Sequence, residues 1–229
     1  MFKNIRERIH RVDYNALSQT RILAQSQTIA NRLRQSGLYS NVLHPPPQLT
    51  DMYSKTYDYI FLPSRLEDAN KRISLAIHAA NKANNVNLVV TGDGPDRDRL
   101  EKIAHENTVS FTGFVSKNRL KELYAKARAV LFLGEEEDYG LTTVEAMKAT
   151  KPVITCVDSG GPLDLVENKK TGYVTNPRIQ DLTPILEHVQ QHPRHCKELG
   201  QNAKERVTTI TWSNYTAAIT DHLQELKRL

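Results

Sequence analysis

Glu137 and Glu145 are separated by seven residues in the stretch "EDYGLTTVE", which also contains a glycine. Gly140 permits a tight turn, and the residues after it have the pattern of a helix start, where the first backbone N–H groups have no partner within the helix. Such groups bind phosphate or sugar oxygens. The amides concerned are those of Leu141, Thr142 and Thr143.

The two glutamates suit a different part of the same ligand. A carboxylate accepts hydrogen bonds from paired hydroxyls, so Glu145, one turn into the helix, could bind a ribose, and Glu137 could bind a second sugar. The stretch therefore suits a diphosphate with a sugar at each end. The alternative is an acidic helix start that only complements the helix dipole.

Basic side chains follow the apolar run "DYIFLP", which has the composition of a buried strand. Arg65 and Lys71 come soon after it. A guanidinium binds phosphate oxygens in pairs and an ammonium adds a point charge, so the two residues favour a diphosphate site if a helix start faces them. Either one alone could be an ordinary surface charge.

The elements that must position these residues alternate between short β-rich runs and helical stretches. We expect helices at about 70–84, 96–105, 117–127 and 141–149, with the runs "DYIFLP", "VNLVVTG", "TVSFTG", "AVLFL" and "KPVITC" as strands. This alternation predicts an α/β fold, a Rossmann-like parallel sheet with helices on both faces. Ligands bind at the carboxyl ends of such strands, where the polar residues above fall.

Three consecutive prolines, Pro45 to Pro47, divide the chain, because proline continues neither a helix nor a central strand. We place a helix-strand-helix segment at 1–44, a proline-rich hinge at 45–52, the α/β domain at 53–210 and a C-terminal helix at 211–229.

Positive charge gathers at the N-terminus. Residues 1–37 hold seven basic and two acidic side chains, which accounts for the whole net charge of +5. Phe2, Ile5, Ile9 and Val12 recur at helical spacing among arginines, so an amphipathic helix on an anionic membrane is one interpretation and a helix packed on the protein is the other. No pattern indicates nucleic-acid binding.

Cys156 and Cys196 lack the spacing of a disulfide framework or a zinc site. Neither a membrane span nor a signal peptide is visible in the sequence, so we expect a cytoplasmic protein, with peripheral membrane contact as an option.

The stretch "EDYGLTTVEAM" resembles the E-x7-E signature of retaining GT-B glycosyltransferases of family 4, the glycosyltransferase group 1 enzymes, usually E-G-F-G-x-x-x-x-E-A-M. Further segments resemble the family's motifs in the family's order over about residues 40–175: "SRLEDANKR", "LVVTGDGP", "VSFTGFVS" and "KPVITCVDSGGPLDLVENKKTGYV". The resemblance implies the C-terminal, donor-binding half of a GT-B fold, preceded by a remnant of the N-terminal acceptor domain.

The resemblance also implies roles for individual residues. Arg65 and Lys71 would hold the diphosphate of a UDP-, GDP- or ADP-sugar and Glu145 the ribose, while Glu137 and the amides of 140–143 would contact the transferred sugar. Gly92 and main-chain atoms near Val115 would line the nucleotide. The family requires no divalent metal and no cofactor, since cationic side chains and a helix start stabilise the leaving diphosphate.

The sequence departs from the family pattern at several positions. Asp138 and Arg72 replace glycines, and Asp164 replaces a glutamate. An extra carboxylate at Asp138 would either select a hydroxyl pattern or point to solvent. The acceptor domain has no full counterpart, which predicts a fragment with little activity alone, whose glycan or lipid-linked acceptor binds through the missing domain. The helix after Trp212 is expected to dock on residues 1–44.

Two other functions remain open at this point. One is a non-catalytic module that binds a nucleotide or a partner subunit. The other is an NAD(P)-dependent oxidoreductase, since "VVTGDGPDR" offers Gly92-x-Gly94 after a strand, but Arg97 stands where the third glycine of the dinucleotide fingerprint belongs.

Overall fold

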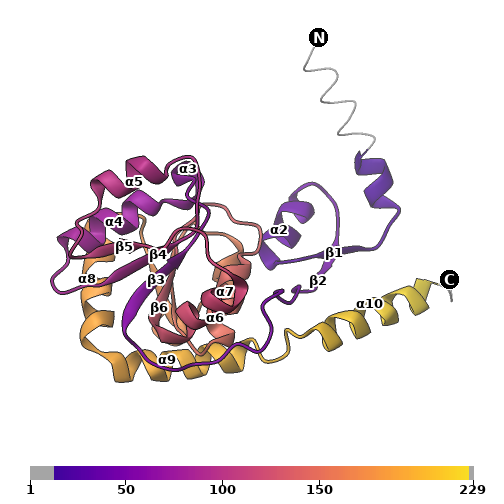
Figure 1. Ribbon diagram of the computed structural model, residues 1–229. Coiled ribbons are helices and arrows are strands. Elements are labelled where there is room, and N and C mark those ends of the chain that lie inside the picture. Colours follow the sequence, from indigo (N-terminus) through magenta and orange to yellow (C-terminus); the bar gives the residue numbers. More distant parts are fainter. Residues whose placement is uncertain (1–12, 227–229) are drawn as a thin grey trace, which may run out of the picture.

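A parallel sheet of six strands forms the centre of the computed structural model, which describes residues 13–226 (Figure 1). Its strands are β3 (Tyr59–Pro63), β4 (Leu88–Thr91), β5 (Val109–Phe111), β6 (Ala127–Phe132), β7 (Val153–Cys156) and β8 (Gly172–Thr175). Their order across the sheet is β5-β4-β3-β6-β7-β8, and every neighbouring pair is parallel. The α/β fold class expected from the sequence is confirmed.

The direction in which the chain crosses the sheet reverses between β3 and β6. From β3 the chain moves outward through β4 to β5, and it then returns to β6 and moves outward on the other side to β8. The loops that follow β3 and β6 therefore diverge to opposite faces of the sheet and leave a crevice between them. This is the position at which doubly wound sheets bind ligands.

Helices cover both faces of the sheet. They are α3 (Asp68–Lys71), α4 (Ile73–Lys82), α5 (Arg97–Ile103), α6 (Lys117–Lys126), α7 (Leu141–Lys148), α8 (Ile179–Gln191) and α9 (Pro193–Arg206), with a 3-10 turn at Gly161–Asp164. One buried cluster joins the sheet to α4, α5 and α8, and a second joins it to α6 and α7. Helix α9 contributes to both clusters.

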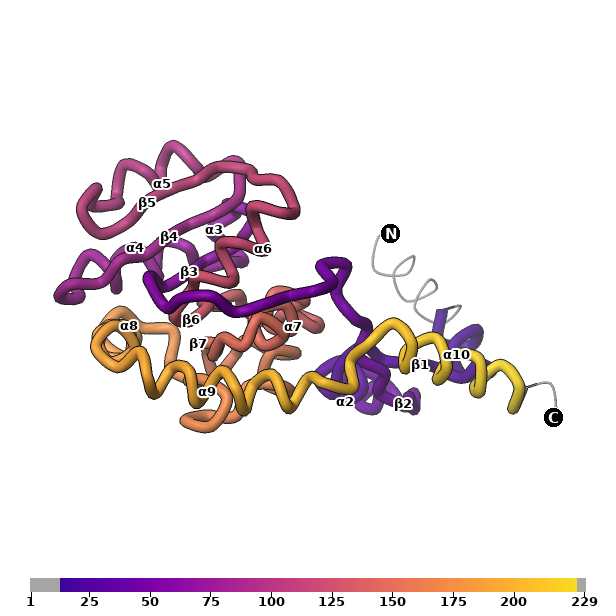
Figure 2. Tube along the Cα trace, turned by 60° about the horizontal axis from the view of Figure 1, so that its bottom comes forward, coloured from indigo at the N-terminus to yellow at the C-terminus, as the bar shows by residue number. Residues whose placement is uncertain are grey.

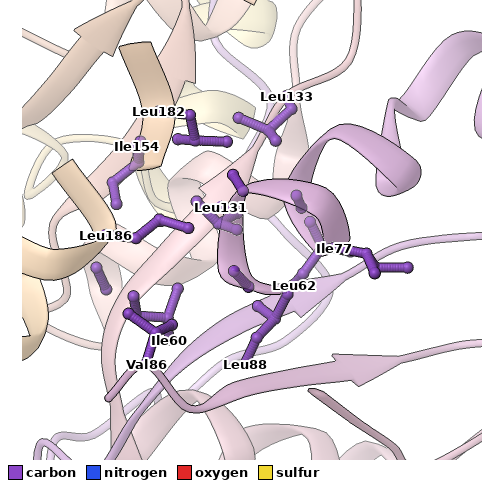
Figure 3. Packing of buried hydrophobic residues seen from close by; sticks show 14 of the residues in the cluster. Ile60, Leu62, Ile77, Val86, Leu88, Leu131, Leu133, Ile154, Leu182 and Leu186 are labelled. Atoms are coloured by element: carbon purple, nitrogen blue, oxygen red, sulfur yellow. The ribbon is translucent and has the colours of Figure 1, made fainter. Parts of the chain in front are cut away.

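The two clusters follow the alternation of side chains along the strands. Ile60 and Leu62 of β3 belong to the cluster that contains α4 and α8, and Phe61 between them belongs to the other. Figure 3 shows the first cluster, where Leu182 and Leu186 of α8 lie over Ile154 and Leu131. Because the strands are buried on both faces, most strand residues are apolar, as is typical of parallel sheets.

Residues 13–44 form a small N-terminal unit beside the α/β domain (Figure 1). Residues 13–18 are helical, and β1 (Ile22–Ala24), α2 (Gln27–Gln35) and β2 (Ser40–Val42) follow, with β1 and β2 paired in parallel. The helix-strand-helix pattern expected from the sequence did not include β2, because only one of its three residues, "SNV", is apolar. The amphipathic pattern of Phe2, Ile5, Ile9 and Val12 lies outside the described residues.

The C-terminal helix α10 (Trp212–Leu226) runs alongside the N-terminal unit, as Figure 2 shows. The indole N–H of Trp212 donates to the carbonyl of Pro47 at 3.3 Å, and Arg21 pairs with Glu225 at 2.5 Å. In the connector itself, Pro46 and Pro47 are buried. Within residues 13–226 no helix is both long and apolar enough to cross a membrane.

Lys151, just before β7, is fully buried, which is uncommon for a lysine. Its ammonium donates to the carbonyl of Thr56 at 2.8 Å and lies 3.7 Å from the ring centre of Tyr57. Burial lowers the pKa of Lys151 to about 7. The folded protein therefore releases a proton that the unfolded chain still binds between pH 7 and the ordinary lysine pKa.

From this difference we expect the free energy of unfolding to rise with pH above 7, by up to about 1.4 kcal/mol per pH unit. Lys151→Met should remove the rise, whereas Lys102→Met, on the exposed surface of α5, should keep it. Urea unfolding between pH 7 and 8.5 measures the slope. Higher pH is avoided because burial raises the pKa of the Cys156 and Cys196 thiols to about 11, which gives a slope of opposite sign. Equal slopes in the Lys151→Met variant and the unaltered chain would contradict this account.

Candidate functional site

The β6–α7 loop (residues 133–140) ends in a left-handed turn at Gly140, which has φ 80° and ψ 67°. A Cβ at this position would lie 2.7 Å from Cγ of Pro162, so the turn requires glycine. Helix α7 begins immediately after it. The N–H groups of Leu141 and Thr142 fall in the first turn, where no carbonyl of the helix can accept from them.

Thr143 corrects one expectation from the sequence. Its N–H donates to the carbonyl of Gly140 at 2.9 Å, so this amide is occupied and cannot bind a ligand as predicted. The Thr143 side chain is also fully buried and faces the core. The reason is that the tight turn at Gly140 brings its own carbonyl within reach of the third helical residue.

Lys71 and Arg65 reach the crevice from the segment after β3. The Lys71 ammonium pairs with Glu137 at 2.5 Å, and both side chains are about one-third exposed, at 32% and 29%. Arg65 is 72% exposed, and its guanidinium lies 3.4 Å from Glu67. The helix start, the ammonium and the exposed guanidinium thus meet at the switch point between β3 and β6.

Two adjoining cavities lie at this edge of the sheet. The smaller, about 230 Å³, is lined by Arg65, Lys71 and Thr142 among others. The larger, about 430 Å³, is lined by Arg65, Gly92, Val115, Thr142 and Glu145 among others. Arg65 and Thr142 line both, together with Pro63 and Ser64, so the cavities form one continuous site.

The structure thus brings most of the sequence-predicted residues together. Arg65, Lys71, Gly92, Val115, Thr142 and Glu145 line the cavities. Glu137 joins them through its contact with Lys71, and Gly140 and Leu141 form the turn that leads into α7. Thr143 stands apart, as described above.

Glu145 is held by a residue that the sequence analysis missed. The phenol of Tyr124, on α6, donates to Oε2 of Glu145 at 2.7 Å. Burial raises the pKa of the Glu145 carboxyl, and this hydrogen bond partly offsets that effect. In the sequence Tyr124 looks like any aromatic residue on the apolar face of a helix, so only the fold reveals where its hydroxyl points.

A close approach of the backbone at Ser64 requires a glycine at position 92. Its φ is 128°, and a Cβ there would lie 1.9 Å from the carbonyl oxygen of Ser64. Its N–H donates to the carbonyl of Gly113 at 3.0 Å. Gly92 therefore lets the loops after β3, β4 and β5 come together around the larger cavity.

Arg72 divides the helix expected at 70–84 into α3 and α4. Its backbone adopts the left-handed conformation, with φ 52° and ψ 42°, which explains why a glycine would suit this position. Its guanidinium pairs with both carboxylate oxygens of Asp158, at 2.7 and 2.8 Å, and with Glu135 at 2.8 Å. The Arg72 hydrogen bonds lower the pKa of the Asp158 carboxyl. The break leaves Lys71 at the end of α3, from which it reaches Glu137.

Asp138 neither contacts the cavities nor points freely to solvent. Its carboxylate pairs with Arg32 of α2 at 2.8 Å, and its carbonyl accepts from the Ser26 hydroxyl at 2.5 Å. Asp164 accepts from the backbone N–H of Gln27 at 2.5 Å. Two departures from the family pattern therefore connect the α/β domain to the N-terminal unit.

The sheet order, the crevice between β3 and β6 and the glycine turn into α7 define one half of a GT-B fold. The chain belongs to the family "Glycosyl transferases group 1", whose model matches residues 53–206. The segment from β3 to α9, with the whole crevice, lies within that match.

Among curated proteins, the chain is 32% identical over 111 residues to alpha-1,3/1,6-mannosyltransferase ALG2 of Dictyostelium discoideum, a match that covers 48% of this chain and 26% of the relative. It is 29% identical over 153 residues to the sulfoquinovosyl transferase SQD2 of Arabidopsis thaliana, covering 65% of this chain and 30% of the relative. The matches thus span between a quarter and a third of these relatives.

Among solved structures, HepE of Anabaena, determined with UDP and glucose, superposes with a TM-score of 0.81 at 21% identity, over 94% of this chain and 66% of that one. Sucrose-phosphate synthase of Thermosynechococcus elongatus superposes with a TM-score of 0.83 at 19% identity, over 95% and 61% of the two chains. At these identities the likeness establishes the fold.

Proposed function

We propose that this chain binds the nucleotide part of a sugar nucleotide and acts as the donor domain of a retaining glycosyltransferase. One observation carries the proposal: Arg65, Lys71 and the free start of α7 converge at the switch point of the sheet. Two cations and a helix start together favour a diphosphate. The family assignment favours this function over an NAD(P)-dependent oxidoreductase.

The proposed binding mode assigns one part of the donor to each part of the site. The diphosphate lies by Arg65, Lys71 and the N–H groups of Leu141 and Thr142, and the ribose hydroxyls bond to Glu145. The base extends into the larger cavity toward Val115, and the transferred sugar lies near Glu137. HepE, a structural neighbour determined with UDP and glucose, supports a nucleotide as the ligand of this chain.

The chemistry we propose is electrostatic and requires neither a divalent metal nor a cofactor. As the bond between sugar and diphosphate breaks, negative charge grows on the leaving diphosphate. Arg65, Lys71 and the positive end of α7 stabilise that charge. The acceptor, a glycan or a lipid-linked sugar, binds largely through parts of the enzyme beyond the donor domain, so we expect this chain alone to transfer little.

A thermal-shift experiment tests the nucleotide site. UDP or GDP at about 100 times its Kd should stabilise the chain by about 2.7 kcal/mol, which raises the melting temperature by about 5 to 10 °C. The shift should be the same with EDTA as with magnesium, and NAD should give none. Arg65→Ala is the matched variant, since its exposed side chain contributes little to stability, and it should show a much smaller shift.

Three outcomes would oppose the proposal. They are a shift with NAD alone, a shift that depends on magnesium, and shifts in Arg65→Ala equal to those of the unaltered chain. Transfer is a separate question from binding. Hydrolysis of a radiolabelled sugar nucleotide, with this chain alone and with the chain joined to a complete acceptor domain, distinguishes a donor domain from a module that binds nucleotides without turnover.

A further inference from the structure

Tyr124 occupies an unusual position for a core tyrosine. Its side chain is fully buried on α6, yet its hydroxyl reaches the lining of the larger cavity. There it donates to Oε2 of Glu145 at 2.7 Å. A buried phenol hydroxyl needs a partner, and the partner of this one is a carboxylate that lines the larger cavity.

The ring of Tyr124 has little freedom to move. It packs edge-on against Phe61 of β3, with ring centres 5.1 Å apart and an interplanar angle of 86°. The neighbouring residue, Leu123, accepts a hydrogen bond through its carbonyl from the hydroxyl of Tyr59, also on β3, at 3.0 Å. Helix α6 is thus fixed to β3 through two neighbouring residues, and the direction of the Tyr124 hydroxyl is fixed with it.

Glu145, in contrast, would have more freedom without this contact. It lies one turn into α7 and is partly buried, and a glutamate side chain without a fixed partner can adopt several staggered rotamers. A hydrogen bond from Tyr124 to Oε2 selects one rotamer and leaves Oε1 and the remaining lone pairs of Oε2 for a ligand. It also favours the charged form of a carboxyl whose pKa burial raises.

We infer that Tyr124 is a positioning residue, which holds the Glu145 carboxylate in the orientation that binds the two ribose hydroxyls of the donor. The inference rests on the proposed function, because it presumes a nucleotide in the larger cavity. It predicts that Tyr124 contributes to the preference for ribose over a sugar that lacks these hydroxyls, rather than to nucleotide affinity in general.

The experiment compares two tyrosine-to-phenylalanine variants, one on α6 and one on the strand against which α6 packs. Tyr124→Phe removes the hydroxyl that contacts Glu145 and keeps the ring against Phe61. Tyr59→Phe is the matched control, because it removes a phenol hydroxyl bonded to the adjacent residue of α6 but no contact with the site. Glu145→Gln serves as the reference for a lost carboxylate.

Calorimetry measures the affinity of each variant for UDP and for 2′,3′-dideoxy-UDP, or for the guanine pair if GDP binds better. The unaltered chain and Tyr59→Phe should prefer the ribonucleotide by about tenfold or more, the effect of hydrogen bonds to a carboxylate. In Tyr124→Phe this preference should fall by about threefold or more, while the affinity for the dideoxy analogue stays unchanged. Glu145→Gln should lose most of the preference.

A second readout is the pH dependence of the same preference. It should disappear as the pH falls through the pKa of the Glu145 carboxyl. In Tyr124→Phe the midpoint should move to higher pH, since the hydroxyl that favours the charged form is gone. A purely structural role for Tyr124 would leave this midpoint in place.

The outcomes separate this inference from the function on which it rests. If the unaltered chain binds neither nucleotide, the proposed function is wrong and the inference is wrong with it. If the chain binds the ribonucleotide selectively but Tyr124→Phe retains the full preference and the same midpoint as Tyr59→Phe, then the donor site stands and the role of Tyr124 is overturned.

Discussion

Lys71→Met is expected to lower the affinity of this chain for a nucleoside diphosphate by about 10- to 100-fold. The ammonium of Lys71 lines the smaller cavity and would make charge-assisted hydrogen bonds to the diphosphate, each of which contributes about 1.5 to 3 kcal/mol. Methionine keeps approximately the length of the side chain and removes only its charge, including the ammonium that lies 5.8 Å from the ring centre of Phe132. Isothermal titration calorimetry with UDP and GDP measures the difference.

The partner of Lys71 provides the contrasting variant. Glu137→Gln removes the carboxylate that lies 2.5 Å from the ammonium, so the affinity for a nucleoside diphosphate should stay the same or rise. The affinity for a complete sugar nucleotide should fall instead, if Glu137 binds the sugar. Lys102→Met, on α5 away from the cavities, should bind like the unaltered chain. Equal affinities in Lys71→Met and Lys102→Met would contradict the diphosphate assignment.

Gly92→Ala is expected to destabilise the fold by about 3 kcal/mol or more, a large fraction of the stability of an ordinary domain. The added methyl group would lie 1.9 Å from the carbonyl oxygen of Ser64, and a backbone with φ 128° disfavours alanine in addition. The loops after β3 and β4 would have to separate. Urea unfolding followed by circular dichroism gives the free-energy difference.

Gly134→Ala is the matched control for that variant. Gly134 stands at the same edge of the sheet, after β6, and a Cβ there would lie 3.3 Å from its nearest neighbour, the carbonyl oxygen of Asn70. We expect a cost of less than about 1.5 kcal/mol. If Gly92→Ala proved as stable as Gly134→Ala, the close approach of the loops would not be a requirement of the fold.

The sheet and the position of the site could be predicted from the sequence for one physical reason. Strands of a parallel sheet are buried on both faces, so runs such as "YIFLP" and "NLVV" are mainly apolar and stand out against the helices between them. Once the strands are parallel, the residues that follow them must gather at one edge. The order of residues along the chain is therefore enough to place Arg65, Lys71 and Glu145 together.

The features of the site that could not be predicted depend on backbone conformation and on contacts between residues far apart in the sequence. Arg72 breaks a helix through a left-handed backbone that a bulky residue seldom adopts, and the compensating carboxylates of Asp158 and Glu135 lie far along the chain. Tyr124 differs from a plain core tyrosine only by the direction of its hydroxyl. Thr143 lost its predicted role because of one hydrogen bond inside the turn.

The acidic residues of the β6–α7 loop illustrate the same limit. Asp138 is bound by Arg32 and Ser26, which precede it by more than a hundred residues, and Glu135 is bound by Arg72. None of these three partners could be predicted from the sequence around the loop. Asp138 thus ties the loop to the N-terminal unit, and Glu135 ties it to the start of α4. Glu137 pairs instead with Lys71, the lysine of the candidate site.

A crystal structure of this chain soaked with UDP or GDP, without divalent cations, is the most direct test of the proposed donor site. The account predicts diphosphate oxygens within hydrogen-bonding distance of Arg65, Lys71 and the N–H groups of Leu141 and Thr142, with the ribose on Glu145. A nucleotide bound elsewhere, or bound in these cavities with its diphosphate away from Lys71 and the start of α7, would contradict it.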